Sequence, residues 1–208
     1  MIKKDILNQP FTLPNGTIVK NRLFKSAMSE AMADKNAAPK PELSTLYKTW
    51  ADGGVGLCVT GNVMIDSRAL GEFNNVVIED ESGLAQLKIW AKAATSNNTQ
   101  CWVQLNHPGK QAPKGLNVET VSPSAIPFND SMKSFFTVPR ELTGVEILDL
   151  VRRFAFAAGG VVAAGFSGVQ CHSAHGYLVS QFLSPHHNQR TDRWGGNAEN
   201  RRRFLIEI

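Results

Sequence analysis

Apolar positions along this chain follow two spacings, short uninterrupted runs and longer stretches with helical periodicity, and the two kinds alternate. The short runs predict four β-strands, at 22–28, 56–62, 100–105 and 168–172. The longer stretches predict helices at about Pro41–Asp52, from a cap at Ser82 to Ala94, from a Thr143-x-x-Glu146 capping box through Ala158, and at 197–208. Strict alternation of strand and helix is typical of a parallel sheet with right-handed crossovers and helices outside.

Two segments fall outside this alternation. Residues 11–19 hold a Pro-Asn-Gly turn signal between two β-like runs, which predicts an N-terminal hairpin. The segment from 106 to about 140 contains five prolines and little periodicity. Loops of this length in a compact domain usually cover a site or contact a substrate, and we expect that here.

Length and composition suit one α/β unit spanning residues 1–208. The chain is 42% apolar and 19% charged, and no low-complexity or Gly/Ser-rich linker interrupts it. A complete (β/α)₈ barrel takes ~250 residues. Four βα units are about half the number in such a barrel, and the family resemblance given below implies that they and the hairpin form the N-terminal half of a TIM (β/α)₈ barrel, with the C-terminal half absent.

Charge and cysteine content exclude several classes of protein. The net charge of +4 does not predict nucleic-acid binding, because aromatics are not interleaved with the arginines between 190 and 203 in the way that single-strand binders need. The three cysteines, Cys58, Cys101 and Cys171, lie in apolar runs without a CxxC pair, which favours reduced, buried thiols and a cytoplasmic location. No apolar stretch has the length of a signal peptide or membrane span, so no membrane partner is expected.

The candidate chemistry follows the fourth strand, at His172, His175 and Tyr177. Ligands of parallel α/β folds lie at the carboxyl ends of the strands. Two imidazole N–H groups can stabilise a carbonyl oxygen that becomes an enolate, and a phenol keeps its proton at pH 7 and can pass it to a carbanion-like carbon. The alternatives are a zinc pair, histidines satisfied by loop backbone, and a tyrosine ring that only packs. Zinc would require further close ligands, and Cys171 should point away from His172.

Four short motifs carry a resemblance to a known family. They are His-x-x-His-Gly-Tyr-Leu at 172–178, Gln-Phe-Leu-Ser-Pro at 181–185, Asn-x-Arg-x-Asp at 188–192 and Trp-Gly-Gly at 194–196. Together they resemble the old yellow enzyme family of FMN-dependent ene-reductases and NADH:flavin oxidoreductases, which are TIM barrels. The resemblance covers essentially the whole chain and is weakest between 113 and 140.

The resemblance implies an activity and two cofactors. It implies FMN as cofactor, NAD(P)H as reductant, and hydride transfer through the flavin to the β-carbon of a small enone-type substrate. His172 and His175 would bind the substrate carbonyl, and Tyr177 would protonate the α-carbon. No Walker loop, GxGxxG or GxSxG motif points to another enzyme class.

Polar residues at three successive strand ends are candidates for the flavin site. Ser29, Asn62 and Gln104 could supply hydrogen bonds to the pyrimidine edge of a flavin, although each taken singly could be an ordinary loop-facing residue. The resemblance implies that Ser26, Ala27, Met28 and Ser29 wrap the isoalloxazine, that Gln104 binds its pyrimidine edge, and that Asn62 lies beside it. The family usually has a small residue at the position of Asn62, and some subgroups have a cysteine at that of Ser29.

A second interpretation is a catalytically inactive, truncated half-barrel that associates through its open sheet edges. In the family, the arginine of the fifth strand and the phosphate-binding loops would lie beyond residue 208. A four-stranded parallel sheet has two unpaired edges, and the helix around 154–166 has almost no polar outward face. We therefore expect a homo-oligomer. A yellow, flavin-containing preparation would favour the enzyme, and a colourless one the inactive half-barrel.

Overall fold

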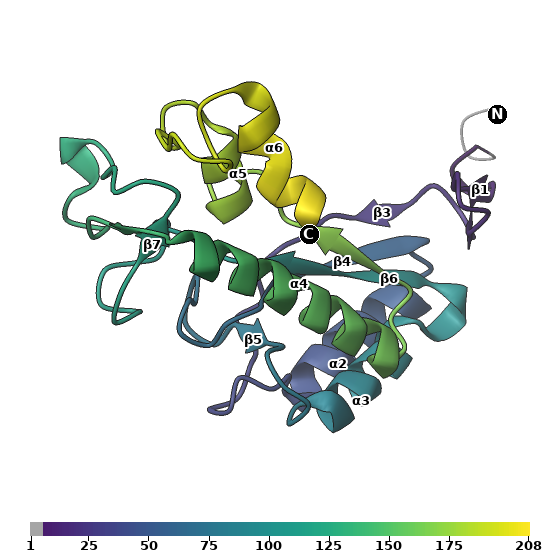
Figure 1. The fold of residues 1–208 in the computed structure, drawn as a ribbon. Coiled ribbons are helices and arrows are strands. Elements are labelled where there is room, and N and C mark those ends of the chain that lie inside the picture. Colours follow the sequence, from purple (N-terminus) through teal and green to yellow (C-terminus); the bar gives the residue numbers. More distant parts are fainter. Residues whose placement is uncertain (1–5) are drawn as a thin grey trace.

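The centre of the molecule is a parallel β-sheet. The computed structural model describes residues 6–208, in which the strands are arranged in the order β3–β4–β6–β9 with β5 beside β4 (Figure 1). Their bounds are Phe24–Lys25 for β3, Leu57–Met64 for β4, Val76–Val77 for β5, Gln100–Asn106 for β6 and Gly168–Cys171 for β9. The four strands of the main path pair in parallel and in sequence order, which confirms the predicted βα repeat.

Three helices lie along one face of this sheet (Figure 1). They are α2 at Pro41–Asp52, α3 at Leu84–Ala94 and α4 at Gly144–Ala164. The bounds predicted for α2 are confirmed, with proline in its first turn. The predicted cap of α3 at Ser82 is wrong. Gly83 occupies the N-cap position without a side-chain bond, because Ser82 donates its hydroxyl hydrogen bond to Asp80.

The longest helix, α4, begins where the capping box predicted. Thr143 Oγ1 accepts from the Glu146 amide at 3.2 Å, and the Glu146 carboxylate accepts from the Thr143 amide at 2.7 Å. The helix runs to Ala164, and Gly165 caps its end in a left-handed conformation. No helix within residues 6–208, α4 included, is long and apolar enough to cross a membrane.

Aromatic packing joins the helices to the sheet. Tyr47 of α2 and Phe166 after α4 each meet Trp90 of α3 edge to face, with ring centroids 5.2 Å apart. Beneath them Cys58 and Cys101 are register partners on β4 and β6, both fully buried. Burial raises the pKa of both thiols, and also that of the half-buried Cys171, so all three stay protonated and unreactive.

The remaining segments lie around the ends of the sheet. The predicted N-terminal hairpin is present as β1 (Phe11–Thr12) paired antiparallel with β2 (Ile18–Val19). The long segment predicted to be irregular contains β7 (Val121–Ser122), paired in parallel with β8 (Arg140–Glu141), and two 3-10 turns occur at Ser96–Asn98 and Asp130–Met132. Within the described residues β3 and β9 each pair on one side only, and association of copies through these edges stays a prediction.

Two helices lie together above α4 in Figure 1, the short α5 at Leu178–Leu183 and α6 at Ala198–Glu207. The periodicity of the sequence predicted α6 but not α5. Phe182 of α5 stacks on Phe204 of α6 at 4.4 Å between ring centroids, and Phe204 also meets Phe154 of α4. These rings connect the segment after β9 to the main core.

Arg190 connects this region to the long loop. Its side chain is only 7% exposed. It donates to the backbone carbonyls of Pro123 at 2.9 Å and Leu142 at 2.5 Å, and it pairs with Asp192 at 2.6 Å. The guanidinium lowers the pKa of the Asp192 carboxyl. The Asn-x-Arg-x-Asp motif therefore holds the segment 120–142 against 188–196.

Replacement of Arg190 by methionine should destabilise the fold. The variant keeps the apolar stem but leaves buried carbonyls without donors, so we expect the free energy of unfolding to fall by about 3 kcal/mol. Chemical denaturation of the full-length protein measures this. Arg202→Met is the matched control, because Arg202 lies exposed on α6. Equal stability of the two variants would contradict the anchoring role.

Candidate active site

A row of three amide side chains crosses the sheet near its carboxyl end. Asn62 of β4 is the register partner of Gln104 on β6, which in turn is the partner of Gln170 on β9. Side chains at matching positions of parallel strands project to the same face. Gln104 Nε2 accordingly donates to Gln170 Oε1 at 2.7 Å. Asn62 Oδ1 is buried without a protein partner among the described residues, so it can accept from a ligand.

His172, His175 and Tyr177 follow the end of β9, next to the amide row. The backbone amide of His172 donates to the carbonyl of Leu105 at 2.9 Å, which continues the pairing of β9 with β6. The ring of His172 lies 5.2 Å from that of His175 and 4.8 Å from that of Tyr177, measured between centroids. Asn62 Nδ2 is 3.5 Å from Tyr177 Oη. The amide row and the histidine pair thus meet at Tyr177.

His172 is held as a neutral hydrogen-bond donor. Its Nδ1 accepts from the amide of Ala174 at 3.2 Å, which leaves the proton of the neutral ring on Nε2. Burial, and then the nearby His175, lowers its pKa to about 4. At pH 7 the ring therefore carries no charge and can donate from Nε2. Residues 6–208 contain no cluster of three or more His, Cys, Asp or Glu side chains that could hold a metal ion.

The turn between β9 and α5 sets the positions of His175 and Tyr177. His175 and Gly176 both adopt left-handed backbone conformations, with φ of 56° and 80°. Such a conformation is uncommon for a residue with a side chain and requires surrounding contacts to hold it. The turn leaves His175 exposed and Tyr177 half-buried at the N-cap of α5. Within the described part of the chain, the Tyr177 O–H donates to no acceptor, so its proton is available to a ligand.

The segment Ser26–Ser29 follows β3 and passes directly over β4. A Cβ atom on Gly61 would overlap the carbonyl of Met28, so only glycine permits this close approach. The Met28 side chain is 56% exposed. The hydroxyl of Ser29 donates to the Glu72 carboxylate, which turns this side chain toward a loop. The segment thus reaches the site through its backbone. No side chain of Ser26, Ala27 or Met28 makes a described contact with the histidines.

The sequence analysis missed two polar residues at this edge of the sheet, Gln170 and Asn106. Gln170 belongs to the amide row, and Asn106, which is fully buried at the end of β6, has both amide atoms without partners among the described residues. A strand periodicity of two would have indicated Gln170, because it lies two residues before His172. Asn106 has the same relation to Gln104.

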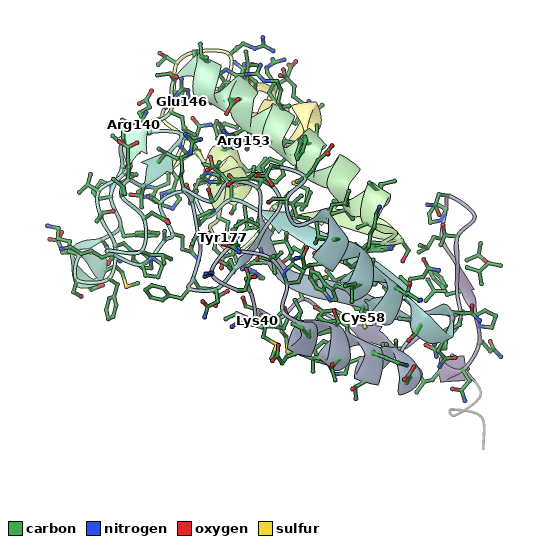
Figure 2. All side chains as sticks on the ribbon, turned by 90° about the horizontal axis from the view of Figure 1, so that it is seen from below. Lys40, Cys58, Arg140, Glu146, Arg153 and Tyr177 are labelled. Carbon is green, nitrogen blue, oxygen red and sulfur yellow. The ribbon has the colours of Figure 1, made fainter. Side chains whose placement is uncertain are left out.

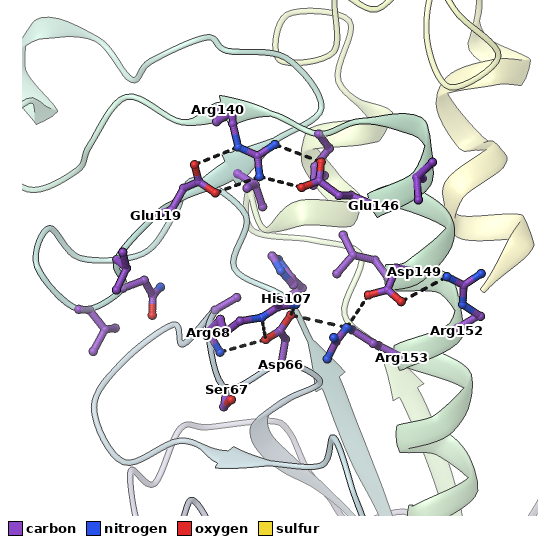
Figure 3. A pocket seen from close by; sticks show the side chains of 18 residues that line it. Asp66, Ser67, Arg68, His107, Glu119, Arg140, Glu146, Asp149, Arg152 and Arg153 are labelled. Carbon is purple, nitrogen blue, oxygen red and sulfur yellow. Dashed lines mark hydrogen bonds and ion pairs between the residues drawn. The ribbon is translucent and has the colours of Figure 1, made fainter.

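A large cavity lies apart from this cluster. It has a volume of about 680 Å³ and is bounded by the beginning of α4 and by loops that include Asp66, His107 and Glu119 (Figure 3). Its charged side chains pair with one another: Arg140 bridges Glu119 and Glu146, and Arg153 bridges Asp66 and Asp149. Figure 2 places Tyr177 near the middle of the molecule, away from Arg140, Glu146 and Arg153. The cavity therefore contains none of the predicted site residues.

Similar solved structures share this fold. An old yellow enzyme homologue from Zymomonas mobilis superposes with a TM-score of 0.86 at 27% identity, over 97% of this chain and 57% of that one. Morphinone reductase in complex with tetrahydroNAD gives the same TM-score at 26% identity, over 97% and 58%. These neighbours confirm the predicted TIM-barrel class, of which the described strands form one part.

Proteins with similar sequences point to the same family as the similar structures. The NADH-dependent flavin oxidoreductase iliE of Hypocrea jecorina is 38% identical over 96% of this chain and 54% of its own length, and the NADPH dehydrogenase of Bacillus cytotoxicus is 38% identical over 97% and 57%. The chain thus spans little more than half the length of these relatives. The first of these names includes NADH and a flavin and the second includes NADPH, in agreement with the predicted cofactors, FMN and NAD(P)H. Residues 6–208 match the NADH:flavin oxidoreductase / NADH oxidase family model, and the chain belongs to that family.

Proposed function

We propose that the protein containing this chain is an FMN-dependent oxidoreductase that passes hydride from NAD(P)H through the flavin to the activated C=C bond of an α,β-unsaturated carbonyl compound. The observation that carries the proposal is the cluster of His172, His175 and Tyr177 beside the amide row. The histidines suit a carbonyl oxygen of the substrate, and the amide row suits the redox ring of the flavin.

The residues present fit a flavin. The pyrimidine edge of the isoalloxazine ring offers both carbonyl acceptors and an N–H donor. Gln104 can donate to such an edge, and the unpartnered Asn62 Oδ1 can accept from it. Ser26, Met28 and Ser29 are exposed residues of a segment that passes close over Gly61 beside Asn62, so this segment can pack against the ring. These groups are uncharged, so they stabilise added negative charge through dipoles placed in advance.

The chain's own residues would orient and protonate the substrate. When bound, FMN supplies the hydride. The Nε2–H of His172 and the imidazole of His175 hold the substrate carbonyl and stabilise the negative charge that develops on its oxygen. The phenol of Tyr177 donates its proton to the α-carbon, because its O–H has no other acceptor within the described residues. His172 contributes a hydrogen bond without a positive charge, because burial keeps its pKa at about 4.

Replacement of Tyr177 by phenylalanine separates the two half-reactions. In the full-length, FMN-loaded protein, NAD(P)H should still reduce the flavin at nearly the normal rate, because that step needs no proton from Tyr177. Reoxidation by cyclohex-2-enone should slow by ~10²–10⁴-fold, the usual contribution of a general acid. Stopped-flow absorbance at the flavin band follows both steps.

The same experiment tests the proposed function. A wild-type protein without a flavin absorption band, or one whose reduced flavin does not react with cyclohex-2-enone, would refute it. Equal slowing of both half-reactions in Tyr177→Phe would rule out Tyr177 as the acid. His172→Ala combined with His175→Ala should instead weaken binding of phenol and of enones, with flavin reduction retained.

The protonation state of His172 can be measured directly. Its folded-state pKa of about 4 lies below the ordinary ~6.5, so the unfolded chain takes up the proton first as the pH falls. The neutral His172 ring therefore makes its full contribution to the free energy of unfolding above pH ~6.5, and this contribution is lost as the pH falls toward 4. In a proton NMR titration of the full-length protein, the ring signal that disappears in His172→Gln should titrate near pH 4. His186→Gln, which removes an exposed imidazole, controls the assignment. A His172 signal that titrates at pH 6.5 or higher would contradict the neutral donor.

A further inference from the structure

One fully buried amide connects the end of β6 to the turn that carries His175 and Tyr177. Gln181, on the first turn of α5, has no exposed surface. Its Nε2 donates to the carbonyl of Gly176 at 2.7 Å and to that of Pro108 at 3.1 Å. Its Oε1 accepts from the amide of Lys110 at 3.3 Å. Both hydrogens of the amide group and its oxygen are therefore used, all on backbone.

The surrounding backbone is shaped around this side chain. Gly109 has a left-handed φ of 59°, and a Cβ atom there would overlap the amide of Gln181. The amide of Leu178 also donates to the carbonyl of His107 at 3.0 Å. The loop after β6 is thus joined to the segment after β9 by one backbone bond and by two bonds of the Gln181 side chain, whose third bond holds Gly176 in the turn. Gln181 is the side chain that links both.

We propose that Gln181 is a positioning residue, which holds the Gly176 carbonyl and so fixes where His175 and Tyr177 stand relative to His172. The proposal rests on the proposed function, because it concerns the same site. Gln181 touches neither the histidine rings nor the phenol in any described contact, so it acts through backbone. The left-handed conformation of His175 supports the need for such a contact, because an isolated turn would relax from it.

Two substitutions at Gln181 test this in the full-length, FMN-loaded protein. Gln181→Met has a similar length and removes all three side-chain bonds. Gln181→Glu keeps the acceptor toward Lys110 but, when ionised, loses both donors and faces two carbonyl oxygens. Gln86→Met and Gln86→Glu are matched controls, because Gln86 is an exposed glutamine on α3.

The first readout is amide hydrogen exchange, which requires no activity. In Gln181→Met, the peptides covering 107–111 and 172–178 should exchange at least tenfold faster than in wild type, while those of α2 and α3 should be unchanged. A merely stabilising residue would instead speed exchange throughout. Unchanged exchange at 172–178 overturns the proposal, whatever the protein catalyses.

The second readout is binding of phenol, measured by calorimetry, beside the rate of flavin reduction. We expect about tenfold weaker phenol binding in Gln181→Met, consistent with the loss of ordinary hydrogen bonds, and flavin reduction within twofold of wild type. Wild-type binding in this variant overturns the proposal. Failure of the wild-type protein to bind phenol refutes the proposed function instead, and hydrogen exchange then decides the role of Gln181.

The third readout is a pH profile, which also serves if Gln181→Met does not fold. Protonation of the buried carboxyl in Gln181→Glu restores one donor. Its phenol affinity relative to wild type should therefore rise as the pH is lowered from 8 to 5.5, while the ratio for Gln86→Glu stays flat. If Gln181→Glu binds phenol more weakly than wild type by the same factor at every pH, the weaker binding does not come from the lost hydrogen bonds to the carbonyls. That result would overturn the proposal.

Discussion

The register between β4, β6 and β9 is the constraint on which the candidate site depends. Parallel strands in register place the side chains of partnered residues side by side on one face of the sheet. Asn62, Gln104 and Gln170 are neighbours for this reason, although they are far apart in sequence. A shift of one residue in any of these strands would place its amide among the helices, where it would lack a partner.

The end of the sheet is built by backbone as much as by side chains. Main chain is placed around the candidate site by the close approach of Ser26–Ser29 over Gly61, by the left-handed turn at His175 and by the bonds of α5 to the loop after β6. Backbone held by buried partners moves little. This is the condition for hydrogen bonds that stabilise charge as it develops without first reorganising.

Burial keeps side chains uncharged both on the helix side of the sheet and at its carboxyl end, but the chemical consequence differs between the two places. On the helix side of the sheet it keeps the thiols of Cys58 and Cys101 protonated and unreactive. At the carboxyl end it keeps His172 uncharged but leaves it a hydrogen that it can donate. Around the cavity beside α4, in contrast, charged side chains gather, and Arg140 and Arg153 each pair with two carboxylates.

The sequence by itself determined the order of strands and helices, the bounds of α2, the capping box of α4 and the grouping of His172, His175 and Tyr177. These features depend on local periodicity, on turn chemistry or on residues a few positions apart, all of which one segment contains. The tertiary structure alone decided the cap of α3, the helix α5, the burial of Arg190, and the parts played by Gln170, Asn106 and Gln181. Each of these depends on a partner contributed by a distant segment, such as the carbonyls of Pro123 and Leu142 for Arg190 or that of Pro108 for Gln181. The local sequence pattern does not predict such a partner, because the contact forms only when strand pairing brings the loops together at the carboxyl end of the sheet.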